Sequence, residues 1–175
     1  MTQEEKCAES LKMKRIMEVF TDPDFLSCMK ETAELEKNRI FCRHDPAHLK
    51  DTARLAYIFS LERNYGLDKA VVYTAALLHD CGRAEQYKTG EPHDIAGARI
   101  ARRILEKYDF SAEEKEMIIA AIEGHRGNLK TDCSETAARL AEVLYDADKL
   151  SRECFSCEVS KDCSWSDEKK NMNLF

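Results

Sequence analysis

Residues that interrupt regular secondary structure are scarce in this chain of 175 residues, which has 6 glycines and 3 prolines. Collagen-like repeats and glycine- or proline-rich linkers are therefore excluded. The sequence also lacks sustained alternation of apolar and polar residues and contains no Asn-Gly or Asp-Gly turn, the patterns typical of strands and hairpins. Because the length suits one compact domain, these absences predict a single all-α domain.

Long apolar runs and an excess of positive charge are also missing. No segment reaches the roughly 18–20 apolar residues of a membrane span, and the first residues, MTQEEKCAES, contain no apolar signal region. The formal net charge is −6, which argues against a broad basic surface for nucleic acid. We therefore expect a cytoplasmic protein with reduced cysteines that binds neither membranes nor nucleic acid.

The sequence does contain a series of helical patterns. Apolar residues recur at helical spacing, and several patterns begin at a capping residue, such as Asp45 before Pro46 or Ser111 three residues before Glu114. Helices are predicted over residues 3–20, 24–40, 46–64, 68–80, 92–108, 112–125 and 134–150. We divide the chain into N-terminal helices packed on the core (1–41), a main helical domain (42–152) and a short Cys-rich C-terminal tail (153–175).

Five of the predicted helices each place one residue of a metal-ligand type on the apolar face. These residues are His48, His79, His93, His125 and Asp148, and Asp80 follows His79 directly. Burying so many polar groups without partners would cost several kcal/mol, about 1–3 for each, so a shared cation is the simplest explanation. The mixture of imidazole and carboxylate favours iron, manganese, zinc or nickel. His44 precedes its helix and is expected behind these residues or at the surface.

The order of these residues resembles the HD-domain superfamily of metal-dependent phosphohydrolases, a helical fold named after its His-Asp doublet. The resemblance covers about residues 42–152. It is carried by the doublet in ALLHDCGR, by the start DPAHLKDTARLA, and by the phrases PHDIAGARIARRIL, IIAAIEGH and DADKLSR. The resemblance implies an HD-domain helical bundle and a metal-dependent phosphohydrolase.

Two of the histidines, His93 and His125, are those that bimetal members of the superfamily add. The resemblance implies that His48, His79 and Asp148 hold one metal, that His93 and His125 hold the other, and that Asp80 bridges both. The phrases HDIAGARIA and AIEGH are most similar to the bacterial symmetrical diadenosine tetraphosphate hydrolases, which use a di-iron centre. This implies two divalent transition metals, iron or manganese, and a metal-activated water that hydrolyses a small phosphate ester or anhydride such as a nucleotide or dinucleoside polyphosphate.

Basic residues next to the expected ligands are candidates for binding the substrate phosphate. Arg83, three residues after Asp80, stands where members of the superfamily often have Lys or Arg, so Asp80 and Arg83 are the expected catalytic residues. Lys149 and Arg126 follow the last two ligands and are further candidates, although a base near a helix end also complements the helix dipole.

Three cysteines lie close together in the tail, at Cys154, Cys157 and Cys163. Free thiols, a structural zinc site and an iron–sulfur cluster remain open, with zinc favoured over iron–sulfur because nothing else indicates electron transfer. Cys42 is the favoured fourth ligand, because it precedes His48 by six residues and Cys154 follows Asp148 by six. Cys28, Cys81, Cys133 and His44 compete with it. Outside this site, the simplest interpretation makes Cys7, Cys28, Cys81 and Cys133 small buried or half-buried apolar residues.

Two other functions fit the same sequence. Some HD-fold enzymes that resemble this ligand set are mixed-valence di-iron oxygenases, which consume O₂, whereas a hydrolase releases phosphate without it. A metal- or redox-sensing regulator would depend on Cys154 and Cys157 and not on His79.

Overall fold

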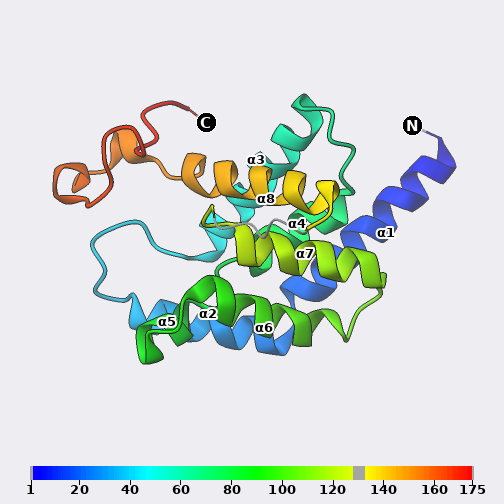
Figure 1. The fold of residues 1–175 in the computed structure, drawn as a ribbon, viewed down its shortest axis with the longest axis horizontal. Helices are drawn as coiled ribbons and strands as arrows, with labels where there is room; N and C mark the ends of the chain where they lie inside the picture. Colours follow the sequence, from blue (N-terminus) through cyan, green and yellow to red (C-terminus); the bar gives the residue numbers. More distant parts are fainter. Residues whose placement is uncertain (1, 128–132, 175) are drawn as a thin grey trace.

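The computed structural model describes residues 2–127 and 133–174, and in these ranges it is helical with no strand. The prediction of an all-α domain is confirmed (Figure 1). No helix of the described ranges is both long and apolar enough to cross a bilayer. The helices are α1 (Gln3–Phe20), α2 (Pro23–Leu35), α3 (Pro46–Glu62), α4 (Lys69–Leu78), α5 (Arg83–Thr89), α6 (His93–Leu105), α7 (Ala112–Gly124) and α8 (Glu135–Leu150), followed by the short 3₁₀ turns η1 (Cys154–Ser156) and η2 (Ser160–Asp162).

Helix α4 lies at the centre of the bundle, because its sequence KAVVYTAALL is apolar on nearly every side. Eight of its ten residues are buried. It contacts α1, α3, α7 and α8, and α6 covers α7 (Figure 1). The turn that follows α4 carries His79 and Asp80, so these two residues emerge from the most buried helix of the fold.

Side-chain caps set where the helices begin. Asp45 accepts a hydrogen bond from the backbone N–H of His48 at 3.0 Å, and Pro46 occupies the first turn of α3. Asp68, Ser111 and Ser134 cap α4, α7 and α8 in the same way. The cap at Asp45 matters for the site, because it fixes the turn of α3 on which His48 lies.

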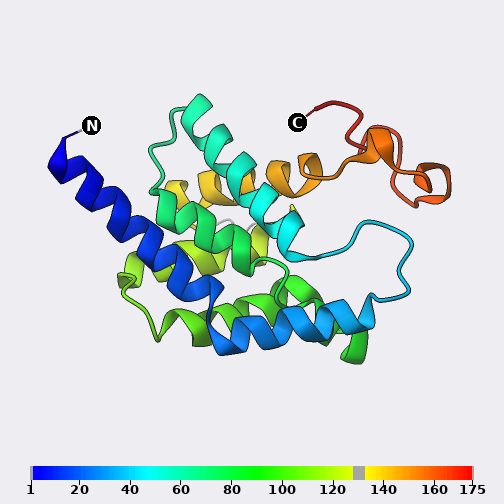
Figure 2. The same ribbon diagram turned by 180° about the vertical axis from the view of Figure 1, so that it is seen from behind.

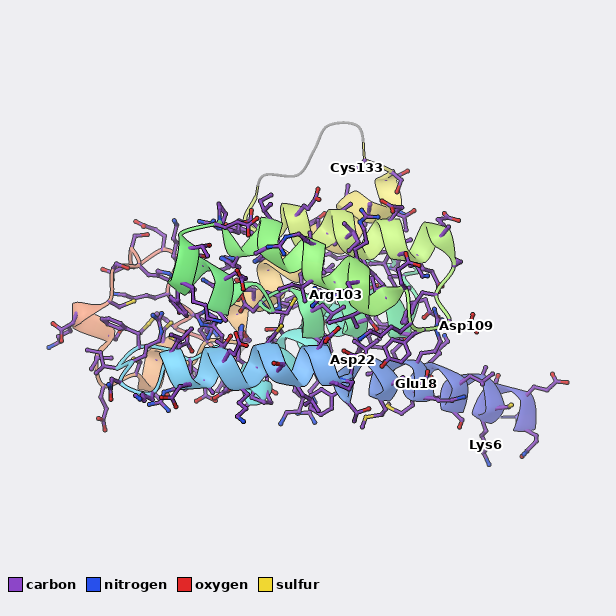
Figure 3. The ribbon with its side chains drawn as sticks, turned by 90° about the horizontal axis from the view of Figure 1, so that it is seen from below. Lys6, Glu18, Asp22, Arg103, Asp109 and Cys133 are labelled. Carbon is purple, nitrogen blue, oxygen red and sulfur yellow. The ribbon has the colours of Figure 1, made fainter. Side chains whose placement is uncertain are left out.

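The N-terminal helices are attached to the turn that follows α6 through Asp22, at the junction of α1 and α2 (Figure 3). Its carboxylate caps α2 and accepts hydrogen bonds from Lys107 at 2.9 Å and Tyr108 at 2.8 Å. The first half of α1 extends beyond the core, as seen from behind in Figure 2, and only Ile16 and Val19 of this helix are buried. Cys7 is therefore exposed, and the prediction of burial for it was wrong.

Between α2 and α6 the structure differs from the prediction in two features, the end of α2 and the presence of α5. Helix α2 ends at Leu35 and not near Ile40, because the Glu36 carboxylate turns inward and accepts a hydrogen bond from the backbone N–H of His44 at 2.9 Å. Helix α5 was not predicted. Its seven residues lie between Gly82 and Gly90, a span too short to show a helical period.

Gly82 brings the turn after α4 into backbone contact with α6. A Cβ atom at this position would lie 2.2 Å from the carbonyl oxygen of His93 and 2.5 Å from the nitrogen of Gly97. Neither backbone atom can move without displacing the helix. Glycine is therefore required here for close approach, and the same contact positions His93 beside His79.

We expect Gly82→Ala to lower the free energy of unfolding by about 1–3 kcal/mol, because it overpacks a backbone contact. Gly97→Ala is the matched control: it lies in the same contact, but its Cβ would have no neighbour closer than 3.4 Å and it would gain helix propensity. Urea unfolding of both variants checks this. Equal stability of the two variants would contradict the proposed role of Gly82.

Candidate metal centre

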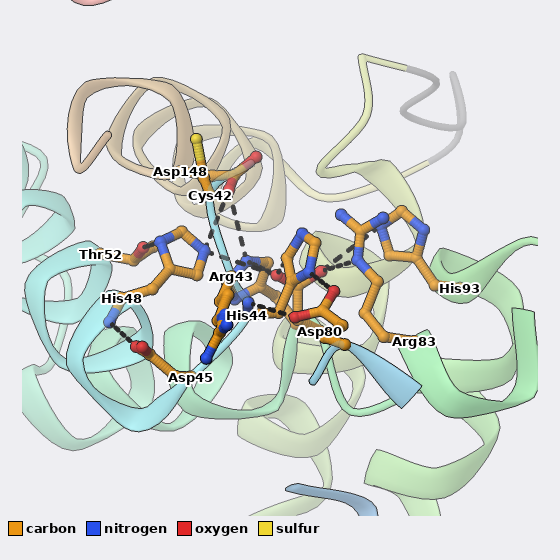
Figure 4. A network of polar contacts seen from close by, with 12 residues as sticks. Cys42, Arg43, His44, Asp45, His48, Thr52, Asp80, Arg83, His93 and Asp148 are labelled. Carbon is orange, nitrogen blue, oxygen red and sulfur yellow. Dashed lines mark hydrogen bonds and ion pairs between the residues drawn. The ribbon is translucent and has the colours of Figure 1, made fainter. Parts of the chain in front are cut away.

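The six residues predicted as metal ligands meet in one buried site. Figure 4 labels four of them, His48, Asp80, His93 and Asp148. His79 and Asp80 come from the end of α4, and the others from the start of α3, the start of α6, the end of α7 and the last turn of α8. None is more than 7% exposed. Their ligand atoms form two groups within 4.8 Å, of which one comprises His48, His79, Asp80 and Asp148 and the other Asp80, His93 and His125.

Asp80 is the residue that the two groups share. Its Oδ2 atom lies 3.1 Å from His79 Nε2 and 3.4 Å from His48 Nε2. Its Oδ1 atom lies 3.5 Å from His93 Nε2, in the second group. Asp148 completes the first group, with Oδ1 at 3.3 Å from His48 Nε2. One carboxylate thus presents one oxygen to each group.

Backbone carbonyls fix the orientation of two of the imidazoles. His79 Nδ1 lies 2.7 Å from the carbonyl oxygen of Ala76, and His125 Nδ1 lies 2.6 Å from that of Ile122. A carbonyl oxygen can only accept, so each Nδ1 carries a proton and each Nε2 faces the centre. Metal-ligating histidines are oriented in this way in proteins.

Side chains do the same for the other two imidazoles. His93 Nδ1 lies 2.5 Å from Gln86 Oε1, on the unpredicted helix α5. His48 Nδ1 lies 3.0 Å from the hydroxyl of Ser151, which itself donates to the carbonyl oxygen of Asp148 at 3.0 Å, so Nδ1 must be the donor. All four Nε2 atoms therefore face the centre and are the nitrogens available to a metal ion.

This arrangement fits metal ions. His93 Nε2 and His125 Nε2 lie 3.1 Å apart, which places two bare lone pairs against each other. His79 Nε2 and Asp80 Oδ2 are buried without a hydrogen-bond partner. Lone pairs in such contact repel each other, and buried polar atoms without partners are costly, unless a cation lies among them.

The pKa values in the site depend on burial and on neighbouring charges. Burial alone would raise the pKa of Asp80, but the charges of His79 and Arg83 outweigh it and hold that pKa well below the usual range. Burial and the charge of Arg83 lower the pKa of His93 to about 2, and burial with the charge of His79 lowers that of His125 to about 4. Both histidines are neutral at pH 7, as ligation requires.

His79 titrates in the opposite direction. Burial alone would lower its pKa, but the charges of Asp80 and Asp148 raise it to about 9. A proton on His79 thus balances the two carboxylates at neutral pH, and a metal ion must displace this proton to bind.

The predicted phosphate-binding bases lie at different distances from the ligands. Arg83 Nε donates to Asp80 Oδ1 at 2.7 Å, and Lys149 Nζ donates to Asp148 Oδ2 at 2.7 Å. Arg126 does not reach a predicted ligand and instead contacts Asp94 at 3.4 Å, with nearly half of its side chain exposed. Arg83 and Lys149 therefore belong to the centre, and Arg126 lies at its rim.

Arg152 is a residue of the site that the sequence reasoning missed. Its Nη2 atom donates to His48 Nε2 at 2.8 Å and lies 3.6 Å from Asp148 Oδ1, and its Nη1 atom donates to the carbonyl oxygen of Arg43 at 2.8 Å. It follows the end of α8 but lies four residues after Asp148, the spacing that keeps two side chains on one helix face. That spacing was the available signal.

His44 lies buried behind the ligands, one of the two positions expected for it. Its Nε2 atom is 4.0 Å from Asp80 Oδ2, and its Nδ1 atom is 2.5 Å from Glu36 Oε1. Burial alone would raise the pKa of Glu36, but hydrogen bonds from His44 and Tyr87 lower it to about 2. Glu36 and Tyr87 were also missed, because neither lies on a predicted apolar stripe with the ligands.

Comparison with known proteins agrees with this geometry. The family model for the HD domain matches residues 47–153. A protein of Clostridium beijerinckii, described as an uncharacterized protein, is 38% identical over 163 residues, which make up 93% of this chain and 99% of that protein.

Shorter matches join this chain to larger proteins. A ribonuclease Y of Clostridium kluyveri is 34% identical over 83 residues, 47% of this chain and 15% of that enzyme. A bifunctional uridylyltransferase/uridylyl-removing enzyme of Rhodopseudomonas palustris is 39% identical over 57 residues, 33% of this chain and 6% of that enzyme. The matched segment of this chain thus corresponds to a small part of either enzyme.

A solved structure shares the fold. The crystal structure of a predicted HD superfamily hydrolase from an uncultured Thermotogales bacterium superimposes with a TM-score of 0.60 at 23% identity, covering 85% of this chain and 80% of that one. With the family match and the buried His/Asp cluster, the expected HD-type helical fold and the expected class of metal-dependent phosphohydrolase are confirmed. The chain belongs to the HD domain family.

Proposed function

We propose that this protein hydrolyses a small phosphate ester or anhydride, a nucleotide or a dinucleoside polyphosphate, at a centre of two divalent transition metals, with iron or manganese as the preferred ions. The single observation that supports two ions is the second group of ligand atoms, in which His93 Nε2 and His125 Nε2 face each other at 3.1 Å next to Asp80 Oδ1. A one-metal site would leave this pair of lone pairs uncompensated.

The residues divide into two sets around Asp80. His48, His79, Asp80 and Asp148 would hold one ion, and Asp80, His93 and His125 the other. Two divalent ions in such a site supply a water nucleophile at neutral pH and neutralise charge on the phosphoryl group. Neutral imidazoles and two carboxylates leave positive charge on the bound pair, and this attracts an anionic substrate.

The basic side chains of the site are placed to bind the rest of the phosphate charge. Arg83 is held by its Nε atom on Asp80, so its two remaining nitrogens can donate to phosphate oxygens. Lys149 lies beside Asp148, and Arg152 lies beside His48. In a protein with a net charge of −6, these three bases favour a small anion at this position over an extended nucleic acid.

A cleft leads from the surface to His48. It has a volume of about 430 Å³ and is lined by the 40–47 segment on one side and by residues 151–157 on the other, with Arg43 and Arg152 among them. This volume lies within the range of small-molecule sites, which supports a nucleotide-sized substrate.

We expect about two iron or manganese ions per chain in protein purified with that metal and without chelators, counted apart from any zinc. His125→Ala should reduce this to about one, because it removes half of the facing imidazole pair and leaves the first group intact. Asp146→Asn is the control, since Asp146 lies on α8 near Asp148 but pairs with Arg63 at the surface. Elemental analysis checks the counts, and an unchanged count in His125→Ala would contradict the second ion.

Gln86→Leu should weaken binding of one of the two ions by about 10–100-fold and leave the other unchanged, because Gln86 orients His93 and has no contact with the first group in the described structure. Metal titration followed by calorimetry would detect one weakened step. A uniform loss of both steps would instead indicate a general loss of structure, and no change would show that Gln86 does not orient the ligand.

Phosphate release from nucleotides and dinucleoside polyphosphates should proceed under anaerobic conditions with iron or manganese. Asp80→Ala should abolish it, because the shared carboxylate holds both ions, whereas Asp146→Asn should retain it. A phosphate assay paired with an oxygen electrode checks this. Oxygen consumption without phosphate release would identify the oxygenase chemistry that the same ligands can support, and activity retained in Asp80→Ala would overturn the assignment.

A further inference from the structure

The C-terminal tail, here residues 153–174, has an ordered path but almost no apolar core. Within it, Cys154 and Asn171 are the buried residues among those described, and large apolar side chains such as Phe155 are exposed. Its regular structure consists of η1 and η2, of three residues each. So little buried surface cannot offset the entropy of ordering a segment of this length, so another interaction must hold the tail.

Four cysteines gather at the base of this tail. Burial raises the pKa of the Cys154 thiol, and the charges of Cys42, Cys163 and Cys157 raise it further, which places all three near it. Cys42 belongs to the loop between α2 and α3, and this loop and the tail lie at the same end of the molecule (Figures 1 and 2). None of the four forms a disulfide.

The surroundings of the cluster include polar groups. The backbone of Asn171 lowers the pKa of Cys154, although burial outweighs this effect and the net shift is upward. The ammonium group of Lys170 lies close to Cys163 and Cys154, whose charges raise its pKa after the larger effect of Asp167. A nearby cation stabilises negative sulfur, but burial keeps the Cys154 thiol protonated, so its thiolate forms only when a metal ion displaces the proton.

The backbone of the tail folds in turns of three residues that match the cysteine spacing. The N–H of Cys157 donates to the carbonyl oxygen of Cys154, that of Ser160 donates to Cys157, and that of Cys163 donates to Ser160. Each of the two 3₁₀ turns ends at a cysteine, Cys157 after η1 and Cys163 after η2, and the extended backbone of Cys157 separates the two turns.

We propose that Cys42, Cys154, Cys157 and Cys163 bind one structural zinc ion that fastens the tail to the loop before α3. Four thiolates in a tetrahedron fill every coordination position of zinc and leave none for a substrate, which defines a structural site. The thiols release their protons to solvent as the ion binds. In tetrahedral zinc sites the sulfurs are about 3.8 Å apart.

The ion-free cluster is more open than this. Among the described residues, the groups of three or more ligand atoms within 4.8 Å are the two made of His and Asp, so the sulfurs must move closer on binding. Cys42, Cys157 and Cys163 are half-buried side chains on loops and can make this movement toward the buried Cys154.

The zinc site would border the catalytic cleft. Cys42 and Cys157 line the same cleft as His48. Cys42 and the three tail cysteines lie outside residues 47–153, which the HD family model matches. The proposed zinc site is therefore an addition to the family domain. It would hold the two chain segments that carry His48 and Asp148 next to each other.

The test is the zinc content of the full chain, purified without chelators and treated with a mercurial thiol reagent that releases only thiolate-bound metal. We expect about one zinc per chain to be released, also from Asp80→Ala, in which the His/Asp centre is disabled. Cys154→Ser and Cys163→Ser should lose this zinc and melt at lower temperature. Cys7→Ser, an exposed cysteine on α1, is the control and should keep it.

Three results would overturn the proposal: no zinc released by the mercurial, Cys42 and the three tail thiols of the folded wild-type chain reacting with a thiol reagent as fast as the exposed Cys7, or iron with acid-labile sulfide in place of zinc. If Cys154→Ser fails to fold, Cys163→Ser and the wild-type titration still decide. Substitution with Co²⁺ gives a further readout, since thiolates produce sulfur-to-cobalt charge-transfer bands that the His/Asp centre cannot produce. This test is independent of any phosphohydrolase activity.

Discussion

The fold depends on one buried carboxylate. Asp80 is 1% exposed and lies among the Nε2 atoms of three imidazoles and the guanidinium of Arg83. A charged group at this depth is destabilising unless opposite charge surrounds it. Arg83 and the protonated His79 supply this charge, and neutral imidazoles around Asp80, such as His93, are oriented by their own hydrogen bonds. The same packing of helix ends therefore forms the bundle and brings the ligands of the metal centre together.

The sequence predicted most of this centre because its ligands lie on buried faces or ends of regular helices, where a period of 3.6 residues relates each ligand to the apolar core. His93 and Asp148 are examples. The same reasoning failed where no period exists. Glu36 leaves α2 to bind His44 in a loop, and α5 is too short to show a pattern. Long-range contacts between loops depend on the folded arrangement and carry no local signal.

The net charge of this protein repels an anionic substrate, whereas the local charge at the site attracts it. A chain with a net charge of −6 repels anions at long range, yet Arg83, Lys149 and Arg152 lie within hydrogen-bond distance of the candidate ligands. Each base is held by a group that a metal ion would also bind, so bases and ions share the same carboxylates and imidazoles. Binding of ions would loosen these bases from their present partners and make their donors accessible to a phosphate group.

The two chain segments that carry His48 and Asp148 meet again a few residues away from the centre. Arg152 joins them by donating to His48 and to the carbonyl oxygen of Arg43. Cys42 directly precedes Arg43, and Cys154 follows Arg152 by two residues. The loop before α3 has no helical hydrogen bonds of its own to define its path. Its position therefore depends on Glu36 at one end and on Asp45 at the other. Between these two residues, the loop is held by the hydrogen bond from Arg152 to the carbonyl oxygen of Arg43. A loop with a defined position keeps His48 Nε2 at 3.3 Å from Asp148 Oδ1. This position matters for function, because a displacement of about 1 Å is enough to lower catalysis by about 10²-fold.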